Sequence, residues 1–536
     1  MAQPQAQSSE ISVQFPNEIL LQIFESLCFH CTNPGKFPNA DTEDVLEDKA
    51  TLARLCRASH HFRSLAQPIL YHYYATGNCK HFLPRGVPYY EVPGANDRLL
   101  SFATTLTKRP NLAAEVASMQ LINHPGGYRE YHEDKNFLAL QSLIVWSHSH
   151  RALSATMLEL VLDKWYTNPD TPADWEARAH RWVMSLAMVL AVKVKDVVIA
   201  IDDEEESRQA FPELDHAPIR SLRTLGMMSW GANPYHLAYM RGLLRAAPNL
   251  ETIYAVDASD SLWWNFRSPW EHKTYTPMPK VKKVVISDLC PRNLDRFLAR
   301  TTGLEELEYY WTVFPQHSTE LYTHLLPAKA TLKRLVVSFL PSGEQEFRPL
   351  PWFWYDYVDA KVRRIQSLAD FPLLEDVTVD ARTLYRQDES DAADRLTRFL
   401  PAGIRRFRIA YAVADMTESL RELAGAAAHM FPRLESVVVG VPRWPNGYPK
   451  RNPNMWAGLE LLFRGLGIRF GWVEDTPWPD VHTVIPGATG RGLRLLPWYE
   501  KEDEDIEEVE EVEGMEEFVD RLMKDEAASS SDWADW

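Results

Sequence analysis

The residues at the N-terminal end of the chain that are best suited to chemistry are two cysteines, in the segment Cys28-Phe-His-Cys31. Thiolate sulfur and imidazole nitrogen are preferred ligands of zinc, and a structural zinc site needs four ligands in a tetrahedral array. Cys56 and His60 or His61 are the residues that the sequence offers for the remaining positions. However, the chain has one Cys-x-x-Cys pair, and Cys28 falls on the apolar end of a predicted helix, where buried thiols are common. We therefore expect no metal site.

Motifs of known enzyme classes are missing from the sequence. There is no Gly-x-Ser-x-Gly, no His-Glu-x-x-His, no phosphate-binding glycine loop and no dinucleotide fingerprint. The glycine-rich segment 487–492 lacks the Lys-Ser/Thr pair that would engage a phosphate, so we interpret it as a loop. We expect a non-catalytic protein without a cofactor, and we assign no catalytic residues.

Two runs of aromatic residues are candidates for binding another protein. Each interrupts a regular pattern of predicted strands, one after residue 260 and one near residue 352. Aromatic side chains on rim loops often form binding hot spots. The alternative is that these loops fold back and cover the sheet. The candidate substrate-binding residues are Trp263, Trp264, Phe266, Trp270, Trp352 and Trp354.

The length and composition of the chain indicate a folded protein with a large hydrophobic core. The chain has 536 residues, of which 45% are hydrophobic and 24% charged, so we expect more than one packing unit. No apolar run approaches the roughly 20 residues of a membrane helix, the N-terminus does not resemble a signal peptide, and five scattered cysteines make no disulfide framework. We expect a protein of the cytosol or nucleus, without a membrane partner.

The acidic charge is concentrated at the C-terminus. Of the net charge of −17, residues 500–536 carry −14, so the rest of the chain is close to neutral. No basic field is present to attract nucleic acid. We expect the tail to be solvated and mostly disordered because its like charges repel one another. The alternative is that it contacts a basic partner.

The first regular signal is a set of short helices near the N-terminus. The segment FPNEILLQIF at residues 15–24 places a proline in the first turn and an acidic residue at the positive end of the helix, followed by apolar residues at helical spacing. Residues 51–65 repeat the pattern, Pro68 is expected to end that helix, and residues 69–71 begin another turn. Three short helices can bury few side chains among themselves, so apolar surface should remain exposed. Such a surface predicts a binding partner or, alternatively, helices that pack as a cap on the next domain.

These residues resemble the F-box motif of fungal proteins, over roughly residues 14–75. The resemblance rests on residues 15–24, on residues 52–66 (LARLCRASHHFRSLA) and on the Pro-Ile-Leu-Tyr segment at 68–71. It implies docking on a Skp-type linker protein and, through it, on a cullin. Phe62 stands where many members have Trp, and the polar insertion 28–47 predicts a surface loop. The linker-binding residues that the resemblance implies are Pro16, Ile19, Leu20, Ile23, Phe24, Leu52 and Leu55.

A second pattern recurs along the rest of the chain: an apolar residue, two polar residues, an apolar residue, a variable residue and another apolar residue. Successive copies from Leu222 onward are 23 to 42 residues apart, which suits one strand and one helix per repeat. The pattern predicts a right-handed βα solenoid with a parallel sheet. It resembles the leucine-rich-repeat domains of F-box proteins, although the asparagine ladder of regular repeats is missing. The copies begin at Val194, Leu222, Leu250, Val281, Leu304, Leu332, Leu374, Ile404 and Leu434.

The open face of this sheet is predicted to carry a ladder of opposite charges. Strand side chains alternate between the two faces. One face of successive strands is therefore predicted to carry Lys283, then Glu306 and Glu308, then Arg334, then Asp376 and Asp380, then Arg406 and Arg408. Their sign reverses at every step. Because neighbouring strands lie about 4.8 Å apart, we expect these side chains to pair with one another.

The predicted fold is therefore α/β, with an N-terminal three-helix F-box, an irregular leucine-rich-repeat-like solenoid and a disordered acidic tail. The function implied is a substrate-recognition adaptor of an SCF-type cullin ubiquitin ligase that binds an unidentified protein substrate. The alternative is an interaction scaffold outside ubiquitination, in which the helices cap the solenoid. The predicted segments are a disordered 1–12, the F-box at 13–75, a helical or degenerate-repeat connecting section at 76–190, the solenoid at 191–480, a cap or loop at 481–499 and the tail at 500–536.

Overall fold

The computed structural model describes most of the chain before residue 476. The described residues are 15–37, 43–75, 98–123, 134–153, 172–201, 211, 214, 217–229, 235–256, 258–259, 276–287, 289, 291–311, 321–339, 365, 367–384, 393–410, 416–442 and 453–475. The statements below concern these residues. Among them, no helix combines the length and the apolar composition that a membrane span requires.

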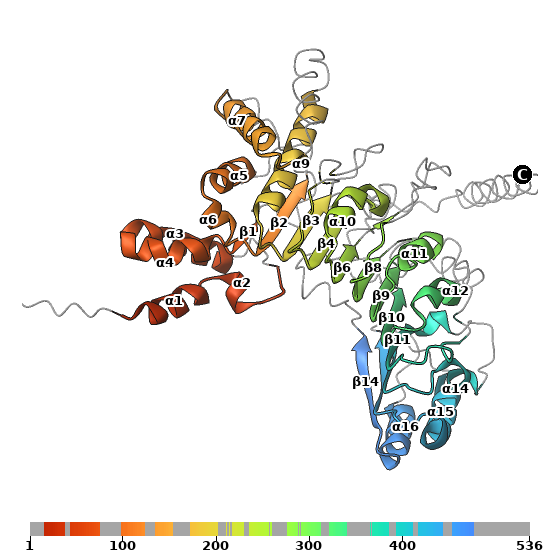
Figure 1. Ribbon diagram of the computed structural model, residues 1–536. Coiled ribbons are helices and arrows are strands. Elements are labelled where there is room, and N and C mark those ends of the chain that lie inside the picture. The colour runs from red at the N-terminus through yellow and green to blue at the C-terminus, as the bar shows by residue number, and fades with distance from the viewer. Residues whose placement is uncertain are drawn as a thin grey trace, which may run out of the picture. The chain divides into compact units, whose positions relative to one another are not determined.

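The described residues form an α/β fold around a twelve-stranded parallel sheet (Figure 1). Each strand pairs with the preceding and following strands of the sheet in chain order. Such an order is compatible with a βα-repeat solenoid, because every coil adds one strand beside the last. The strands are β1 (Tyr73–Ala75), β2 (Ser118–Asn123), β3 (Asp196–Ile201), β4 (Thr224–Ser229), β6 (Thr252–Val256), β8 (Lys283–Ser287), β9 (Glu306–Trp311), β10 (Arg334–Phe339), β11 (Asp376–Asp380), β12 (Arg406–Ala410), β13 (Ser436–Pro442) and β14 (Arg469–Asp475). Strands β5 (Tyr235–His236) and β7 (Ala258–Ser259) make a separate two-stranded parallel sheet.

The register confirms the repeat pattern read from the sequence. In all nine predicted copies, the first apolar residue lies two positions before the first residue of a strand, as Leu222 does before Thr224. The strand starts align across the sheet, so that Thr224 pairs with Thr252 and Glu306 with Arg334. The sheet also extends further than the predicted copies, because β1 and β2 precede them and β14 follows them.

The main core lies between one face of the sheet and the helices. Alternate strand residues such as Leu225 and Met227 of β4, or Val377 and Val379 of β11, are fully buried in it. The predicted helices at 99–106, 138–145, 175–192, 237–246, 293–300, 391–400 and 416–430 all contain helical structure, whereas those at 155–166 and most of 355–368 lie outside the described residues. The α-helices that follow β1 are α5 (Leu99–Lys108), α6 (Pro110–Ala113), α7 (Asp134–His150), α9 (Pro172–Leu190), α10 (Arg241–Ala246), α11 (Pro291–Leu298), α12 (Leu321–Leu325), α14 (Arg395–Phe399), α15 (Thr417–Met430) and α16 (Pro453–Gly465). Short 3₁₀ helices are η4 (Leu237–Met240), η5 (Leu326–Ala328) and η6 (Ala381–Thr383).

The predicted charge ladder is confirmed on the opposite face. We call the first residues of β8 to β12, which are Lys283, Glu306, Arg334, Asp376 and Arg406, the charged row. Lys283 lies 3.8 Å from Glu306, and Arg334 lies 3.6 Å from Glu306 and 3.7 Å from Asp376. Arg406 completes the series at 2.9 Å from Asp376. Each charge in the row therefore has at least one opposite charge within 4 Å.

A parallel row of charges lies one residue earlier in the chain. Lys333 contacts Glu305 at 2.7 Å, and Arg405 contacts Glu375 at 3.7 Å and Glu435 at 2.5 Å. The regular strand register produces both rows, since equivalent residues of successive coils must be neighbours.

The N-terminal helices differ in detail from the sequence prediction. They are α1 (Asn17–Ser26), α2 (Phe29–Thr32), α3 (Glu43–Ala58) and α4 (His60–Leu70). The break falls at Ser59, whose extended backbone and side-chain hydrogen bond from the Phe62 N–H cap α4. Pro68 lies inside α4 instead of ending the preceding helix, in the last turn of α4. The expectation of a break at Pro68 was wrong: the boundary between the two helices is at Ser59, and Pro68 removes one backbone hydrogen bond in the last turn of α4 without ending the helix.

The insertion at 28–47 is also more buried than a surface loop. Cys28 is fully buried, and Phe37 is 1% exposed and packs with apolar residues on the sheet, among them Val198 and Tyr254. Residues 38–42 lie outside the described residues. The described part of the insertion thus joins the helices to the sheet instead of projecting from them.

Candidate functional site

The N-terminal helices pack around a small core of their own. Leu20 and Phe24 of α1, Leu52 and Cys56 of α3, and Ile69 of α4 are buried in it. Phe24 also meets the ring of Phe62 edge to face, with ring centroids 5.7 Å apart. Phe62 therefore fills the part of this core where the F-box resemblance leads one to expect Trp. Tight packing of α1 against α3 and α4 fixes which side of α1 faces outward.

The outward side of α1 carries exposed apolar side chains. Ile19 and Ile23 are 41% and 48% exposed, and Phe15, which precedes the helix, is 58% exposed. Pro16 is exposed as well. Ile19 and Ile23 are four residues apart, so they lie on one side of the helix, and Phe15 and Pro16 stand four and three residues before Ile19. We call Phe15, Pro16, Ile19 and Ile23 the α1 apolar face.

The seven linker-binding residues expected from the resemblance thus divide into two groups. Pro16, Ile19 and Ile23 belong to the α1 apolar face. Leu55 is half-buried against the helical core, and Leu20, Phe24 and Leu52 lie inside it. The buried members can shape a docking surface but do not themselves form it.

The helical core continues directly into the sheet. Tyr73, the first residue of β1, is buried in the same cluster as Leu20 and Phe24. The Lys49 ammonium of α3 donates to the Tyr73 carbonyl at 3.3 Å and lies 4.3 Å from the centre of the Tyr73 ring. Burial lowers the pKa of Lys49 to about 8. These contacts attach the helices to the start of the sheet (Figure 1).

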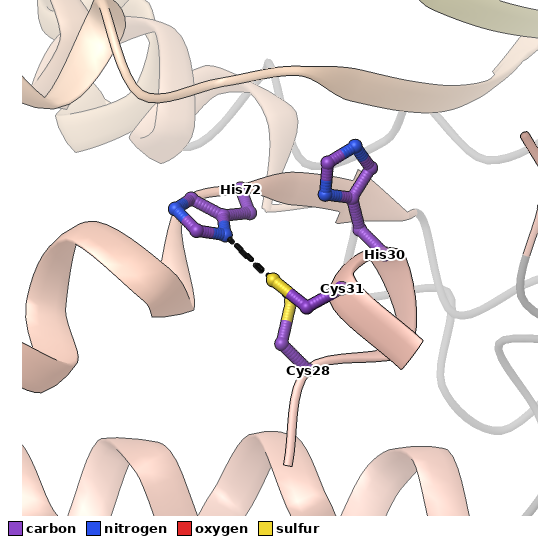
Figure 2. Close-up of side chains that lie close together, drawn as sticks. All are labelled: Cys28, His30, Cys31 and His72. Atoms are coloured by element: carbon purple, nitrogen blue, oxygen red, sulfur yellow. Dashed lines mark hydrogen bonds between the residues drawn. The ribbon is translucent and has the colours of Figure 1, made fainter. Parts of the chain in front are cut away.

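Four potential metal ligands meet at this junction. Cys28, His30 and Cys31 come from the start of α2, and His72 lies between α4 and β1 (Figure 2). One donor atom from each residue lies within 4.8 Å of the others. The Nδ1 atom of His72 is 3.2 Å from the Cys31 sulfur and 3.9 Å from the Cys28 sulfur. We call these four residues the Cys–His cluster.

Burial sets the protonation of this cluster. It lowers the pKa of His30 and of His72, so that both rings are held neutral and keep a nitrogen lone pair. Burial, together with the nearby Cys28 thiol, raises the pKa of Cys31 to about 12. Cys28, Cys31 and Cys56 are all free cysteines. The cluster therefore presents two thiols and two neutral imidazoles in a confined space.

The ligands considered from the sequence are only partly those of the cluster. Cys56 belongs to the helical core instead, and His60 and His61 are exposed on α4. Sequence reasoning missed His72 because it is 41 residues from Cys31 and belongs to no short metal-binding motif. The signal that was available is the Cys-x-His-Cys segment followed by a histidine at the end of the second helical stretch.

The predicted substrate-binding residues cannot be placed in the same way. Trp263, Trp264, Phe266, Trp270, Trp352 and Trp354 lie outside the described residues. The described part of the sheet face carries a small apolar cluster in β3, β4, β6, β8, β9 and β10, with Phe37 packed in it. Whether the aromatic residues bind a substrate stays a prediction.

Comparison with known proteins adds no family assignment. No protein-family model matches the chain, and no curated protein matches it.

Proposed function

We propose that the chain is a substrate-recognition adaptor of an SCF-type cullin ubiquitin ligase, which docks a Skp-type linker through its F-box-like helices. The observation that carries the proposal is the α1 apolar face. It lies within the segment that resembles the F-box, and it is left in water while Leu20, Phe24, Leu52 and Ile69 of that segment are buried.

The energetics favour a partner on this face. Burying an isoleucine side chain from full exposure gains about 1.5 to 3 kcal/mol. Ile19 and Ile23 are already about half buried, so covering both would gain roughly the equivalent of one full side chain. Phe15, two residues before the first residue of α1, adds a larger exposed ring. A linker that covers these residues would therefore gain apolar burial without disturbing the core beneath them.

The repeats would supply the second half of the function. A parallel sheet built from successive coils gives an extended surface suited to holding a protein partner. We propose that the substrate contacts the aromatic segments near residues 263 and 352, and not the charged row, whose charges already neutralise one another. The substrate is proposed to be a cytosolic or nuclear protein.

One observation favours the scaffold alternative. The buried contact of Tyr73 with the helical core means that these helices also cover the first strand of the sheet. A cap of this kind needs Leu20, Phe24 and Leu52 but has no use for exposed isoleucines on α1. The two functions therefore differ in what Ile19 and Ile23 do.

Co-purification with a fungal Skp-type linker separates the two functions. We expect Ile19→Asp combined with Ile23→Asp to abolish linker binding, because each change places a charge in the middle of an apolar contact. The matched control is Leu138→Asp combined with Val145→Asp, which charges two apolar residues of α7 that are 60% and 66% exposed. The control should bind the linker as the unchanged protein does. Unaltered linker binding by the α1 double variant, with native circular dichroism, would rule out docking through this face.

A further inference from the structure

We propose that the Cys–His cluster is a structural zinc site, in which Cys28, His30, Cys31 and His72 hold one Zn²⁺ ion. The proposal does not depend on the adaptor function, because it rests on the geometry and chemistry of the four side chains alone.

The distances suit a tetrahedral ion. Zinc–sulfur bonds of about 2.3 Å and zinc–nitrogen bonds of about 2.0 Å place tetrahedral ligand atoms roughly 3.3 to 3.8 Å from one another. The two measured separations from His72 Nδ1, 3.2 Å to Cys31 and 3.9 Å to Cys28, bracket that range. The 4.8 Å limit that contains all four donors is about 1 Å larger, which small side-chain rotations can close.

His30 supplies an independent observation that points to a ligand at this cluster. Its Nδ1 atom is buried and has no hydrogen-bond partner among the described residues. A buried polar atom without a partner costs about 1 to 3 kcal/mol, so native structures rarely leave one in place. The ring of His30 meets the ring of His72 edge to face, with centroids 5.9 Å apart (Figure 2). Coordination to a shared ion would satisfy it.

The donor set points to zinc among the metals. Two thiolates and two imidazoles in a tetrahedral array are typical of structural zinc, whereas magnesium and calcium prefer oxygen ligands. On binding, the thiols of Cys28 and Cys31 each release a proton to solvent, and the two imidazoles bind as neutral ligands. Two thiolate charges then balance the divalent ion. A neutral complex is the one that a partly buried position tolerates best.

The position of the site explains what the ion would do. Three ligands come from α2, which has only four residues and too few internal hydrogen bonds to be stable alone. The fourth, His72, lies where the chain passes from α4 into the sheet, and its carbonyl accepts the N–H groups of Ala117 and Ser118. The ion would fasten the inserted segment to the junction between helices and sheet.

Metal analysis of the full-length protein tests the proposal. We expect one zinc ion per chain after purification without chelators, and its loss in Cys31→Ser and in His72→Ala. The matched control is Cys56→Ser, which removes the third cysteine of the helical core from outside the cluster and should keep its zinc. His30→Ala should weaken zinc retention against a competing chelator, whereas a three-ligand site would be unaffected by this change.

Cobalt substitution keeps the test decisive if a variant fails to fold. The unchanged protein, stripped of metal under reducing conditions and titrated with Co²⁺, should develop thiolate-to-cobalt charge-transfer absorption and the visible bands of tetrahedral cobalt. Adding Zn²⁺ should abolish both. Absence of zinc in the purified protein together with absence of a tetrahedral cobalt spectrum would overturn the proposal. Retention of zinc by both Cys31→Ser and His72→Ala would overturn it as well.

Discussion

The charged row of the sheet and the α1 apolar face both reach the surface of the protein, but only the side chains of the charged row already have partners there. Along the charged row, Lys283, Glu306 and Arg334 each lie within 4 Å of an opposite charge. On α1, Ile19 and Ile23 project about half of their surface into solvent above a core that is already complete. A row of paired charges gains little from a partner, because charges near the surface that are already paired or hydrated gain little free energy from a further ion pair. An apolar face gains from any partner that covers it, so we expect docking on α1.

The largest expected effect is on the free energy of unfolding, and it compares a residue on the buried side of α1 with one on the exposed side. Phe24→Ala should destabilise the helical core by about 3 to 5 kcal/mol, because it leaves a cavity beside Phe62. Ile23→Ala on the exposed side should cost less than about 1 kcal/mol. Thermal unfolding, with hydrogen exchange of residues 17–70, measures both. Equal losses would mean that α1 is not divided into a structural side and a docking side.

The next largest effect on stability tests whether the buried ion pairs of the sheet contribute more than the exposed ones. Glu308 is buried, accepts a hydrogen bond from Tyr310 at 2.8 Å and lies 2.5 Å from Arg334. Glu308→Ala should therefore cost about 3 kcal/mol, because it removes the buried carboxylate that pairs with Lys283 and Arg334 and that accepts the Tyr310 hydroxyl. The control is Glu306→Ala, whose side chain is 41% exposed and whose loss should cost less than about 1 kcal/mol. If the Glu308 variant is as stable as the Glu306 variant, the buried carboxylate contributes no more to stability than the exposed one, which would contradict this prediction.

The smallest effect is the pH dependence of the exposed ion pairs. The Lys333 ammonium, which donates a hydrogen bond to Glu305, lowers the pKa of that carboxyl group. The unfolded chain therefore takes up this proton at a higher pH than the folded chain. The pair stabilises the fold above the ordinary glutamate pKa, and its contribution is lost as the pH falls through the lowered value. Glu305→Gln should flatten the stability profile slightly in that acidic window; an unchanged slope there would mean that the pair contributes nothing.

The sheet could be predicted from the sequence because its information is local and repeated. An apolar residue two positions before each strand, as at Leu222 or Leu374, marks where the strand begins, and residue alternation then places Glu306 and Arg334 on one face. β14 was not predicted because the spacing shifts by one residue there, at Ile468. β2 does carry the pattern, at Val116 and Met119, but stands apart from the main series.

The Cys–His cluster could not be predicted in the same way, since its members meet only through tertiary packing. Cys28 and Cys31 are visible as a pair, whereas His72 reaches them because α4 turns back along the helical core and ends beside α2. The exposure of Ile23 and the burial of Leu20 likewise depend on which side of α1 meets α3 and α4. Helical periodicity places both Leu20 and Ile23 in an apolar stripe but does not indicate which of them faces a partner.

Hydrogen exchange of the full-length chain with and without a purified Skp-type linker tests the central claim most directly, because it reports on both compared regions in one experiment. The adaptor account predicts slower exchange in α1 and the adjoining α3 and α4 when the linker is present, with no change in β8 to β12. It also predicts that this protection disappears in the Ile19→Asp, Ile23→Asp variant. Unchanged exchange in α1 at saturating linker, or protection that appears in β8 to β12 instead, would contradict it.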